Sequence, residues 1–456
     1  MDSPGKKTAA AIHQEVAREV STLLGVIFAE RRKTGRLDLE AVEMAVRAGM
    51  HRAGAACLTE LLQQEPPVER DLSCPCGGIA QYREMRSKSL LTAVGPAQML
   101  RPYYLCADCH QGQFPTDRCL DVEGTEFSAG VRRMLALVGS DASSFDQGRQ
   151  QMQGLAGLEV STKAVERVAE AIGADIGSRE QDQIERALQL ELPMAVGQAA
   201  PVMYVEMDGT GVPVVAEETQ GRAGKREGQR AHTREVKLGC VFTQTRVDDQ
   251  GHPVRDPDST TYTGAIETAA EFSRRLYSEA WQRGWGRAKK KVLIGDGAEW
   301  VWNIGQEQFP DAIQIVDLFH ARQHLWELGA KLYPSDEAAK RRWIMKYQHL
   351  LDEGQIEKLV AYLRTLDSAT TELEHQIETE ANYFLRNADR MRYPQFRRQG
   401  LFIGSGVIEA GCKTVVAARL KRSGMFWTVR GANAIIALRC CRISGRFEDY
   451  WETRRG

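Results

Sequence analysis

The stretch Lys291–Trp326, KVLIGDGAEWVWNIGQEQFPDAIQIVDLFHARQHLW, decides the fold. Two short apolar runs, Val292–Ile294 and Ile313–Val316, each lead into an aspartate and then into a segment with helical spacing. Repetition of strand, aspartate and helix is a βαβ pattern, because short apolar runs buried on both faces suit a parallel sheet. Catalytic groups of open α/β sheets gather at the carboxyl ends of the strands. Asp296 and Asp317 are therefore candidates for an acidic site.

The length and composition are those of an ordinary globular protein. The chain has 456 residues, of which 43% are hydrophobic and 27% charged, enough for about two to four domains. No apolar run reaches about eighteen residues, so no membrane span is predicted. The N-terminal MDSPGKKTAA lacks the apolar region of a signal peptide. We therefore expect a cytoplasmic protein.

The net charge of −1 hides a basic region near the C-terminus. Between Arg386 and Arg446 only Asp389 and Glu409 oppose a series of arginines and lysines. Such a local field attracts a polyanion, although a solvated basic face is the alternative for any single residue. Residues predicted to contact DNA are Lys413, Arg419, Lys421, Arg422, Trp427 and Arg430. Core packing is the alternative for Trp427, and a pair with Glu409 is the alternative for Lys413.

Two segments before the α/β domain are predicted to be helical. Residues 1–70 form an N-terminal helical region with apolar residues at spacings of three and four. Its apolar face consists of Ile12, Val16, Val20, Leu23, Leu24 and Ile27. Residues 121–198 are also helical, and the turn at 157–161 between two helices is typical of a helix-turn-helix. The second helix, 162–172, is not strongly basic, so DNA reading and a plain helical hairpin both stay open.

The cysteines between these segments predict a metal site. Residues 71–120 contain C-P-C at 74–76 and C-A-D-C at 106–109, separated by a strand-like run and a turn. Two close pairs supply the four thiolates of a tetrahedral, structural zinc site. The spacing of the first pair is tighter than the usual C-x2-C, so His110 or Cys119 could replace one of the four ligands. The alternative to a metal site is a set of reduced, partly buried thiols. The predicted zinc-ribbon-like module uses Cys74, Cys76, Cys106 and Cys109.

The remaining residues, 199–456, predict one α/β domain. Gly264–Arg283 is expected to be a helix that leads into the opening stretch, and residues from about 335 to 398 predict an all-helical insertion, because they carry many charges and no strand pattern. The first three predicted strands are Val202–Met207, Val212–Val215 and Glu235–Thr243. The order of a hairpin, a third strand, and then alternating helices and strands is that of a ribonuclease-H-like mixed sheet.

Three carboxylates distant in sequence are predicted to converge on this sheet. Asp208 ends the first strand, Asp296 ends the fourth, and Glu409 lies one turn into a closing helix that runs through Leu420. Three such groups cannot all stay ionised close together without a counter-cation, and magnesium prefers hard oxygen ligands. Two magnesium ions about 3.5–4 Å apart can activate a nucleophile and stabilise the leaving oxygen of a phosphodiester. The implied chemistry is phosphoryl transfer on nucleic acid.

Other acidic residues keep rival interpretations. Asp296 alone could cap a helix, where a short acceptor side chain is favoured. Asp317 could be an alternative metal ligand and His320 could approach the scissile phosphate, or they could be a helix cap and a core histidine. Glu206 shares a strand face with Asp208 and could assist or replace it, although the position at the strand end favours Asp208.

The strings MDGTGV, IGDGAEW, IVDLFHARQHL and SGVIEAGCKTVVAARLKRSGMFW resemble those of DDE transposases of the ISKra type of insertion sequences. The resemblance covers the catalytic half and the cysteine-rich segment before it. It implies a ribonuclease-H-like domain in which Asp208, Asp296 and Glu409 bind two magnesium ions, with manganese as a substitute. The implied reaction is hydrolysis at the ends of the element, followed by attack of the freed 3′-hydroxyl on target DNA.

The resemblance also implies partners. These are the terminal repeats of the element, target DNA and at least one further copy of the chain on DNA, with no membrane. The location implied is the bacterial cytoplasm, with the protein on the nucleoid when it is bound to DNA. Two other hypotheses stay open: a non-catalytic DNA-binding regulator that uses the zinc ribbon and helix-turn-helix, and a stand-alone nuclease with the same site. Strand joining would separate the transposase from the nuclease.

Overall fold

The computed structural model describes residues 39–64, 68–189, 198–224, 231–367 and 370–454, with residue 191 and single positions between 10 and 25. They divide into two compact units, Met1–Ala169 with Trp451–Gly456, and Glu170–Tyr450. The predicted borders of four domains remain predictions. Of the predicted N-terminal apolar face, Val16 and Val20 are helical, whereas Ile12, Leu23, Leu24 and Ile27 lie outside the described residues. A search of the described helices finds none with the length and apolar character of a membrane span.

A helix packs on a long antiparallel hairpin in the first unit. Helix α2 (Leu39–Leu62) lies against β3, where its Gly54 and Ala55 meet the hairpin turn at Val94 and Gly95. Gly95 has a φ of +112°, which favours glycine at this turn. The four strands, in sheet order, are β1 (Asp71–Ser73), β2 (Ile79–Thr92), β3 (Gly95–Cys106) and β4 (Gly112–Gln113).

Helices follow this sheet, as predicted for residues after 121. They are α3 (Pro115–Cys119), α4 (Ala129–Asp141), α5 (Phe145–Gln151), the π-helix η1 (Met152–Ala156) and α6 (Thr162–Leu188). Ser128 and Ser144 cap α4 and α5 by accepting backbone hydrogen bonds. The α6 helix has 27 residues, so it extends well beyond the predicted end at Ile172. The role of this segment in reading DNA remains a prediction.

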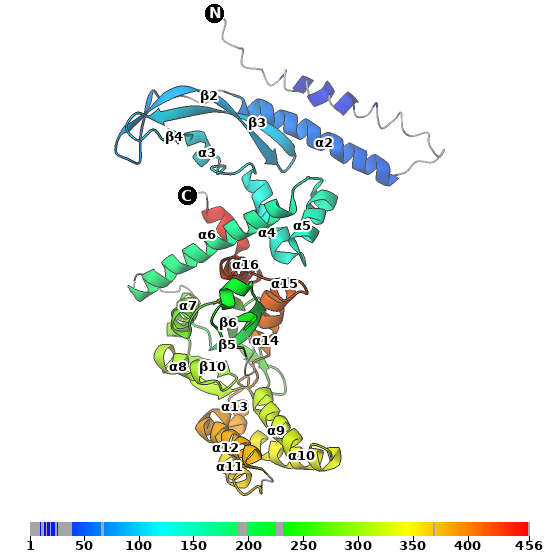
Figure 1. Cartoon of the computed structure of the whole chain (residues 1–456), viewed down its shortest axis with the longest axis vertical. Helices are drawn as coiled ribbons and strands as arrows, with labels where there is room; N and C mark the ends of the chain where they lie inside the picture. Colours follow the sequence, from blue (N-terminus) through cyan, green and yellow to red (C-terminus); the bar gives the residue numbers. More distant parts are fainter. Residues whose placement is uncertain are drawn as a thin grey trace, which may run out of the picture. The chain divides into compact units, whose positions relative to one another are not determined.

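A five-stranded mixed sheet forms the centre of the second unit (Figure 1). Its order is β11-β10-β5-β6-β9, in which β5, β10 and β11 are parallel and β6 is antiparallel to both of its neighbours. The strands are β5 (Val202–Pro213), β6 (Thr233–Gln244), β9 (Thr261–Ala265), β10 (Lys290–Gly295) and β11 (Ile313–Val316). The separate ladder of β7 (Arg246–Val247) and β8 (Pro253–Val254) follows β6. The predicted α/β class is therefore confirmed at this level.

Three details of the predicted strands and helices were wrong. Strand β5 does not end at Asp208, and Val212–Val215 is not its hairpin partner, because β6 pairs with β5 along its whole length, from Val202 to Pro213. The glycines around Thr210 suggested a turn, but twelve residues of ladder pairing keep them extended. The predicted helix at Gly264–Arg283 begins later, at Ala269, because residues before it form the edge strand β9.

Helices cover both faces of this sheet (Figure 1). Helix α7 (Ala269–Gln282) packs on one face, where a side chain at Gly239 of β6 would overlap Leu276. Helix α14 (Gly406–Gly411) packs on the other face, where Gly411 meets Leu238. Successive residues of a strand point to opposite faces, so β6 contacts both helices. The remaining cover consists of α8 (Glu299–Gln308), the π-helix η5 (Cys412–Ala417), α15 (Ala418–Leu420) and α16 (Val429–Ile443). The last helix of the chain is α17 (Phe447–Thr453).

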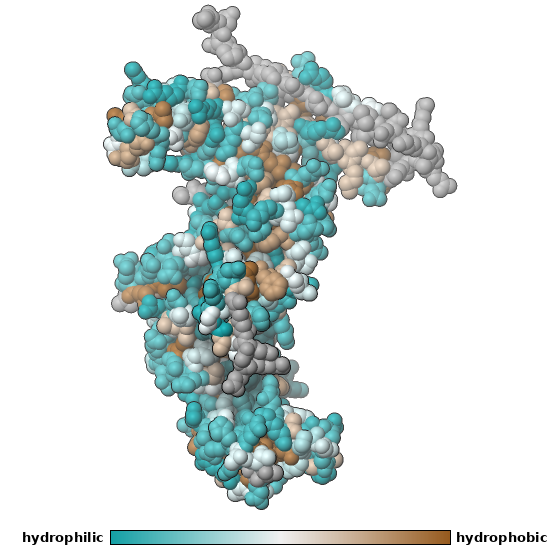
Figure 2. Space-filling view, in the orientation of Figure 1, coloured by the Kyte–Doolittle hydropathy of each residue, from teal (hydrophilic) through white to brown (hydrophobic). Residues whose placement is uncertain are grey.

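The segment between β11 and α14 contains only helices among its described residues, in agreement with the predicted all-helical insertion at about 335–398. They are α9 (Leu318–Leu332), α10 (Glu337–Asp352), α11 (Ile356–Leu363), α12 (Thr371–Arg386), the 3-10 helix η4 (Ala388–Met391) and α13 (Tyr393–Arg398). Figure 2 shows that hydrophilic residues predominate on the visible face of α11 and α12. The apolar residues Leu359, Leu363 and Phe384 are buried between these helices.

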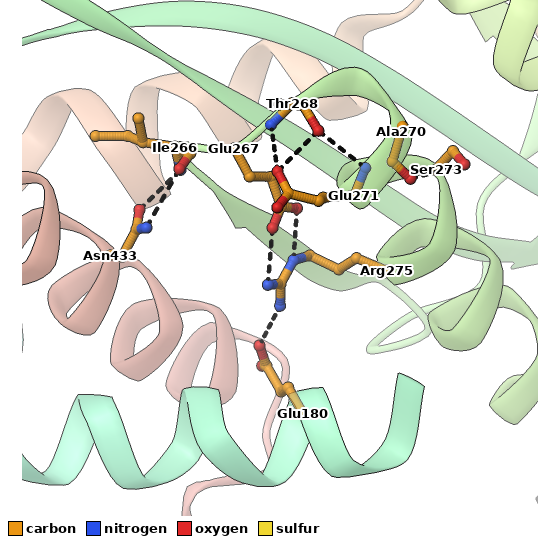
Figure 3. Close-up of polar contacts among 9 residues, drawn as sticks. All are labelled: Glu180, Ile266, Glu267, Thr268, Ala270, Glu271, Ser273, Arg275 and Asn433. Atoms are coloured by element: carbon orange, nitrogen blue, oxygen red, sulfur yellow. Dashed lines mark hydrogen bonds and ion pairs between the residues drawn. The ribbon is translucent and has the colours of Figure 1, made fainter. Parts of the chain in front are cut away.

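A network of ion pairs connects α6 to α7 within the second unit (Figure 3). Arg275 of α7 donates two hydrogen bonds to Glu267, at 2.7 and 3.0 Å, and one to Glu180 of α6, at 2.8 Å. Burial raises the pKa of Glu180 to about 7, and the charge of Arg275 opposes this rise. One guanidinium thus serves two carboxylates, and a proton on Glu180 relieves their repulsion.

Glu180→Gln is expected to reduce the pH dependence of folding stability. The pKa of Glu180 in the folded chain, about 7, lies above its ordinary value of 4.5. The folded state therefore binds more protons between these values, and the free energy of unfolding falls as the pH rises from 4.5 to 7. Urea unfolding at pH 5 and pH 7.5 should show this decline reduced by about 1–3 kcal/mol in the variant. Glu185→Gln, at an exposed position of α6, should show the same fall in the free energy of unfolding as wild type. An unchanged fall in Glu180→Gln would contradict the raised pKa of Glu180.

Candidate functional site

Asp208 and Asp296 lie at the same level of two neighbouring parallel strands. Ile294 of β10 pairs with Glu206 of β5, so two residues further along each strand Asp296 is level with Asp208. Gly295 pairs with Val316 of β11, which brings Asp317 to the same level. Asp296 and Asp317 thus follow the parallel strands β10 and β11, as the βαβ pattern predicted, and Asp208 lies level with them inside β5.

The carboxylate of Asp208 is half-buried beneath η5. It accepts hydrogen bonds from the Gly209 N–H, at 2.6 Å, and from the Cys412 thiol, at 3.4 Å. Burial raises the pKa of Asp208 above its ordinary value; the negative charge of Asp296 adds to the rise, and His320 opposes it. The strand register places Asp296 beside Asp208.

Asp296 lies in a tight turn between β10 and α8. Its side chain accepts a hydrogen bond from the Ala298 N–H at 2.9 Å, and its carbonyl accepts one from the Tyr383 hydroxyl at 3.0 Å. The N-cap residue of α8 is Ala298, so the capping alternative for Asp296 does not describe this turn. Gly297 has a φ of +94°, and a Cβ there would lie 2.6 Å from the Tyr383 oxygen. Glycine at 297 therefore allows the turn and the close approach of α12.

Glu409 lies on α14, which crosses the same face of the sheet. Its side chain is exposed, and its charge raises the pKa of both Glu206 and Cys412. The backbone N–H of Ile408, one residue before it, donates a hydrogen bond of 2.9 Å to Glu206. The helix then widens into η5 at Cys412, and π-helical turns occur frequently at functional sites. The predicted closing helix is present, with this π-helical turn inside it.

The three carboxylates suit divalent ions in their chemistry. Carboxylate oxygens are hard ligands of the kind that magnesium prefers. Their oxygen atoms are more widely spaced than one ion requires: in the part of the chain that the structure describes, only the cysteines bring three or more ligand atoms within 4.8 Å of one another. A site that holds two ions about 3.5–4 Å apart spans a greater distance than a site with one ion, so the wide spacing of the carboxylates suits two ions better.

Asp317 serves a structural purpose in this arrangement. Its side chain is 1% exposed and caps α9 by accepting a hydrogen bond from the His320 N–H at 2.6 Å. It also accepts hydrogen bonds from the Ser405 N–H and from the Ser405 hydroxyl, the latter at 2.7 Å. These contacts favour the helix-cap interpretation of Asp317 over that of an alternative metal ligand.

Asp317→Ala is expected to lower the free energy of unfolding by about 2–4 kcal/mol, because it leaves buried N–H groups at His320 and Ser405 without an acceptor. Chemical denaturation measures the loss. Asp336→Ala removes the cap of α10, which accepts from Ala339 at 2.8 Å in an exposed position, and should cost only about 1 kcal/mol. Equal losses in the two variants would contradict the structural assignment of Asp317.

His320 faces the acidic residues from the first turn of α9. Its ring is half-buried and lies 5.2 Å from that of His324, which stacks on Tyr383 at 3.9 Å. His324 in turn lies 2.7 Å from Glu380 through its Nδ1 atom. This ring series connects His320 with Tyr383, whose hydroxyl donates to the carbonyl of Asp296. Contact of His320 with the scissile phosphate remains a prediction.

Glu206 is completely buried, which favours a structural interpretation of its carboxyl. Its carboxyl accepts from the Ile408 N–H, while its second oxygen has no hydrogen-bond partner among the described residues. Burial raises the pKa of Glu206 to about 8. A carboxyl of this kind anchors α14 to β5. Strand alternation predicted that Glu206 shares a face with Asp208, but its burial depends on α14, which is 202 residues away in sequence.

The four cysteines of the first unit converge as predicted. The Sγ atoms of Cys74 and Cys109 are 3.5 Å apart, and those of Cys76 and Cys106 are 3.7 Å apart. A tetrahedral site with zinc–sulfur bonds of about 2.3 Å has sulfur atoms about 3.8 Å apart. The backbone N–H groups of Cys109 and Asp108 lower the pKa of Cys106 to about 7. Against the backbone N–H groups of Gly78 and Gln111, the neighbouring thiols raise the pKa of Cys76 and Cys109, so the sulfur atoms compete for negative charge that a zinc ion would compensate. The cluster could therefore bind zinc.

Comparison with known sequences gives the family. The model of the Uncharacterised protein family (UPF0236) matches residues 79–454. The chain belongs to this family. A solved structure, the "Drosophila P element transposase strand transfer complex", is similar with 10% sequence identity, a TM-score of 0.25, and coverage of 71% of this chain and 80% of that chain. No curated protein matches the sequence.

The UPF0236 match includes every predicted catalytic and DNA-contacting residue, together with Cys106 and Cys109. Cys74 and Cys76 lie just before its first residue, Ile79. A structural metal site that joins the two cysteine pairs would therefore extend beyond the matched segment. The family description states no activity, so the functional argument comes from the geometry of this chain.

The predicted DNA-contacting residues of this UPF0236 protein fall into two groups. Lys413, Lys421, Arg422 and Arg430 are exposed. Arg419 is only 1% exposed, so the prediction that it faces DNA was wrong; Trp427, at 7%, agrees with the core-packing interpretation of this residue. The guanidinium of Arg419 lies 5.2 Å from the Trp427 ring centre, and the indole N–H donates to the Leu420 carbonyl at 3.2 Å. The sequence analysis also missed Phe426, which is 65% exposed.

Proposed function

We propose that this UPF0236 family member is a DNA transposase of the DDE class. The observation that carries the proposal is the strand register that sets Asp208 level with Asp296, below the helix that carries Glu409. The order β9-β6-β5-β10-β11, with antiparallel pairs followed by parallel pairs, supports a ribonuclease-H-like fold as part of this proposal. The ISKra-type assignment is proposed on the motifs alone.

Asp208, Asp296 and Glu409 are the residues that would hold magnesium, with manganese as a substitute. Bound there, the metal would supply the charge that activates a hydroxyl nucleophile and stabilises the leaving oxygen. Asp208 would bind from the sheet and Glu409 from the covering helix, while the turn at Gly297 holds Asp296 against β5. His320 would contact the scissile phosphate from α9. Asp317 orients His320 and the segment before α14.

The proposed substrates are the terminal repeats of an insertion sequence and a target DNA. The exposed residues Lys413, Lys421, Arg422 and Arg430 would bind their phosphates. Cleavage and joining of two element ends would require at least a dimer on DNA. The proposed location is the bacterial cytoplasm, with the protein on the nucleoid when it is bound to DNA. The cysteine cluster would hold a structural zinc ion, because four protein ligands leave no open coordination position.

A nicking assay tests the proposed site. A duplex that carries the ends of the native element is incubated with magnesium and either wild type or Asp296→Ala. We expect metal-dependent nicking by wild type, with loss of nicking and unchanged DNA binding in the variant. Nicking that persists in Asp296→Ala would remove this residue from the mechanism. Binding by both proteins with no nicking by either would favour a regulator instead.

A further inference from the structure

The loop between α15 and α16 is fixed firmly at its base. Trp427 pairs with the end of β5: its N–H donates to the Pro213 carbonyl at 3.1 Å, and its carbonyl accepts from the Val215 N–H at 2.9 Å. The N–H of its buried indole donates a hydrogen bond to the Leu420 carbonyl at the start of the loop. Arg419 packs against this ring from inside the protein. The residues between Leu420 and Trp427 thus form a short loop with both ends anchored.

Two cations and one aromatic ring project from this loop. Lys421 and Arg422 are exposed, and so is Phe426, at 65%. The Lys421 ammonium contacts the hydroxyl of Thr210, and Arg422 donates to the Ala418 carbonyl at 3.0 Å through Nε. The remaining N–H groups of the Arg422 guanidinium can donate to a phosphate.

The loop lies beside the candidate active site. Thr210 is two residues beyond Asp208 on β5, and alternate residues of a strand share a face. The Lys421 ammonium contacts the Thr210 hydroxyl, so it lies two residues along β5 from Asp208. A ligand held by this loop would adjoin a DNA strand in the site.

An exposed aromatic ring flanked by cations matches the chemistry of an unstacked nucleotide. A base stacked on an aromatic side chain gains about 1–3 kcal/mol, and neighbouring cations bind its phosphate. Inside a duplex both faces of a base are covered by its neighbours, so an interior base must be unpaired or extruded before it offers a face to Phe426. An acidic protein would satisfy the cations but would have no use for the ring's stacking surface.

We propose that Lys421, Arg422 and Phe426 hold an unpaired base at the DNA end next to the active site. Phe426 stacks on the base, and the two cations bind the phosphates on either side. The inference rests on the proposed function, because it takes DNA as the substrate. It deepens that function by naming a distorted or single-stranded end, rather than continuous duplex, as the form that the site recognises.

Binding to two matched DNA ends tests the inference without cleavage. Fluorescence anisotropy in calcium, which prevents turnover in many magnesium enzymes, compares a fully paired element end with the same end carrying three unpaired nucleotides. We expect wild type to prefer the unpaired end about tenfold, in line with one stacked base. Phe426→Ala should abolish the preference and Phe426→Trp should keep it. Met345→Ala, at a 74% exposed position of α10, should also keep it.

The double variant Lys421→Ala/Arg422→Ala should weaken binding to both ends. It should also reduce the slope of log affinity against log salt concentration by about two, because two phosphate contacts are lost. Equal affinity of wild type for the two ends, or a preference that survives Phe426→Ala in a chain with unchanged thermal unfolding, would overturn the inference. Competition by polyglutamate as strong as that by single-stranded DNA would overturn it too. If wild type prefers the unpaired end but cleaves no DNA in magnesium, the inference stands and only the proposed function is contradicted.

Discussion

Asp208→Asn is expected to lower the rate of magnesium-dependent DNA cleavage by about a thousandfold or more, while the protein stays folded and binds DNA. The amide keeps the size of the side chain and can still accept from the Gly209 N–H. It removes the negative charge that a divalent ion requires, and a loss of about 4 kcal/mol of transition-state stabilisation corresponds to three orders of magnitude. Single-turnover cleavage kinetics measure the effect.

Asp311→Asn is the matched control, since Asp311 is an exposed carboxylate of the same unit that pairs with Lys291. It should leave the cleavage rate unchanged. Thermal unfolding of both variants should resemble that of wild type, because the half-buried Asp208 carries a raised pKa and gains little by being ionised without a metal ion. A cleavage rate for Asp208→Asn within a few-fold of wild type would exclude Asp208 as a metal ligand.

Cys106→Ser is expected to release zinc and to unfold the sheet of the first unit. Cys106 is completely buried at the end of β3, where it belongs to a small core with Ala80 and Tyr104. Structural zinc sites contribute about 10–16 kcal/mol of apparent binding free energy, which exceeds what such a core supplies. Purified wild type should contain one zinc ion per chain, and the variant should contain none. The variant should also lose the thermal transition that reports unfolding of the first unit.

Cys119→Ser is the control for the zinc prediction, because Cys119 is exposed on α3 and lies outside the cluster. It should keep one zinc ion per chain. A strong chelator should reproduce the effect of Cys106→Ser on wild type, and added zinc should reverse it. Wild type that holds no zinc, and whose unfolding temperature does not respond to added zinc, would contradict a metal role for these cysteines.

The stretch Lys291–Trp326 predicted its own structure well because each signal in it is local. Short apolar runs of three and four residues, followed by an aspartate and a helical pattern, mark β10 and β11 without reference to distant parts of the chain. The same reasoning failed at Asp208, where glycines on both sides of Thr210 suggested a turn. Pairing with β6 decides the conformation there, and this pairing involves residues up to 42 positions away, as in Val202 with Gln244.

Burial of charged residues was the harder part of the site to predict. Arg419 and Trp427 belong to a basic run that suggested a surface, yet they fill the space between η5 and the end of β5. Phe426, one residue before Trp427, is exposed instead. Nothing in the local sequence separates these roles, because they depend on which side of the loop packs against β5. The cysteines were easier, since their spacing itself defines a site.

Strand joining tests the central claim most directly. A pre-nicked element end with a labelled 3′-hydroxyl is incubated with wild type, magnesium and a supercoiled target plasmid, beside the same end carrying a 3′-deoxy terminus. The account predicts labelled plasmid with the hydroxyl end, and none with the deoxy end or with Asp208→Asn. Cleavage of DNA without any joined product from the 3′-hydroxyl end would contradict a transposase and leave a nuclease.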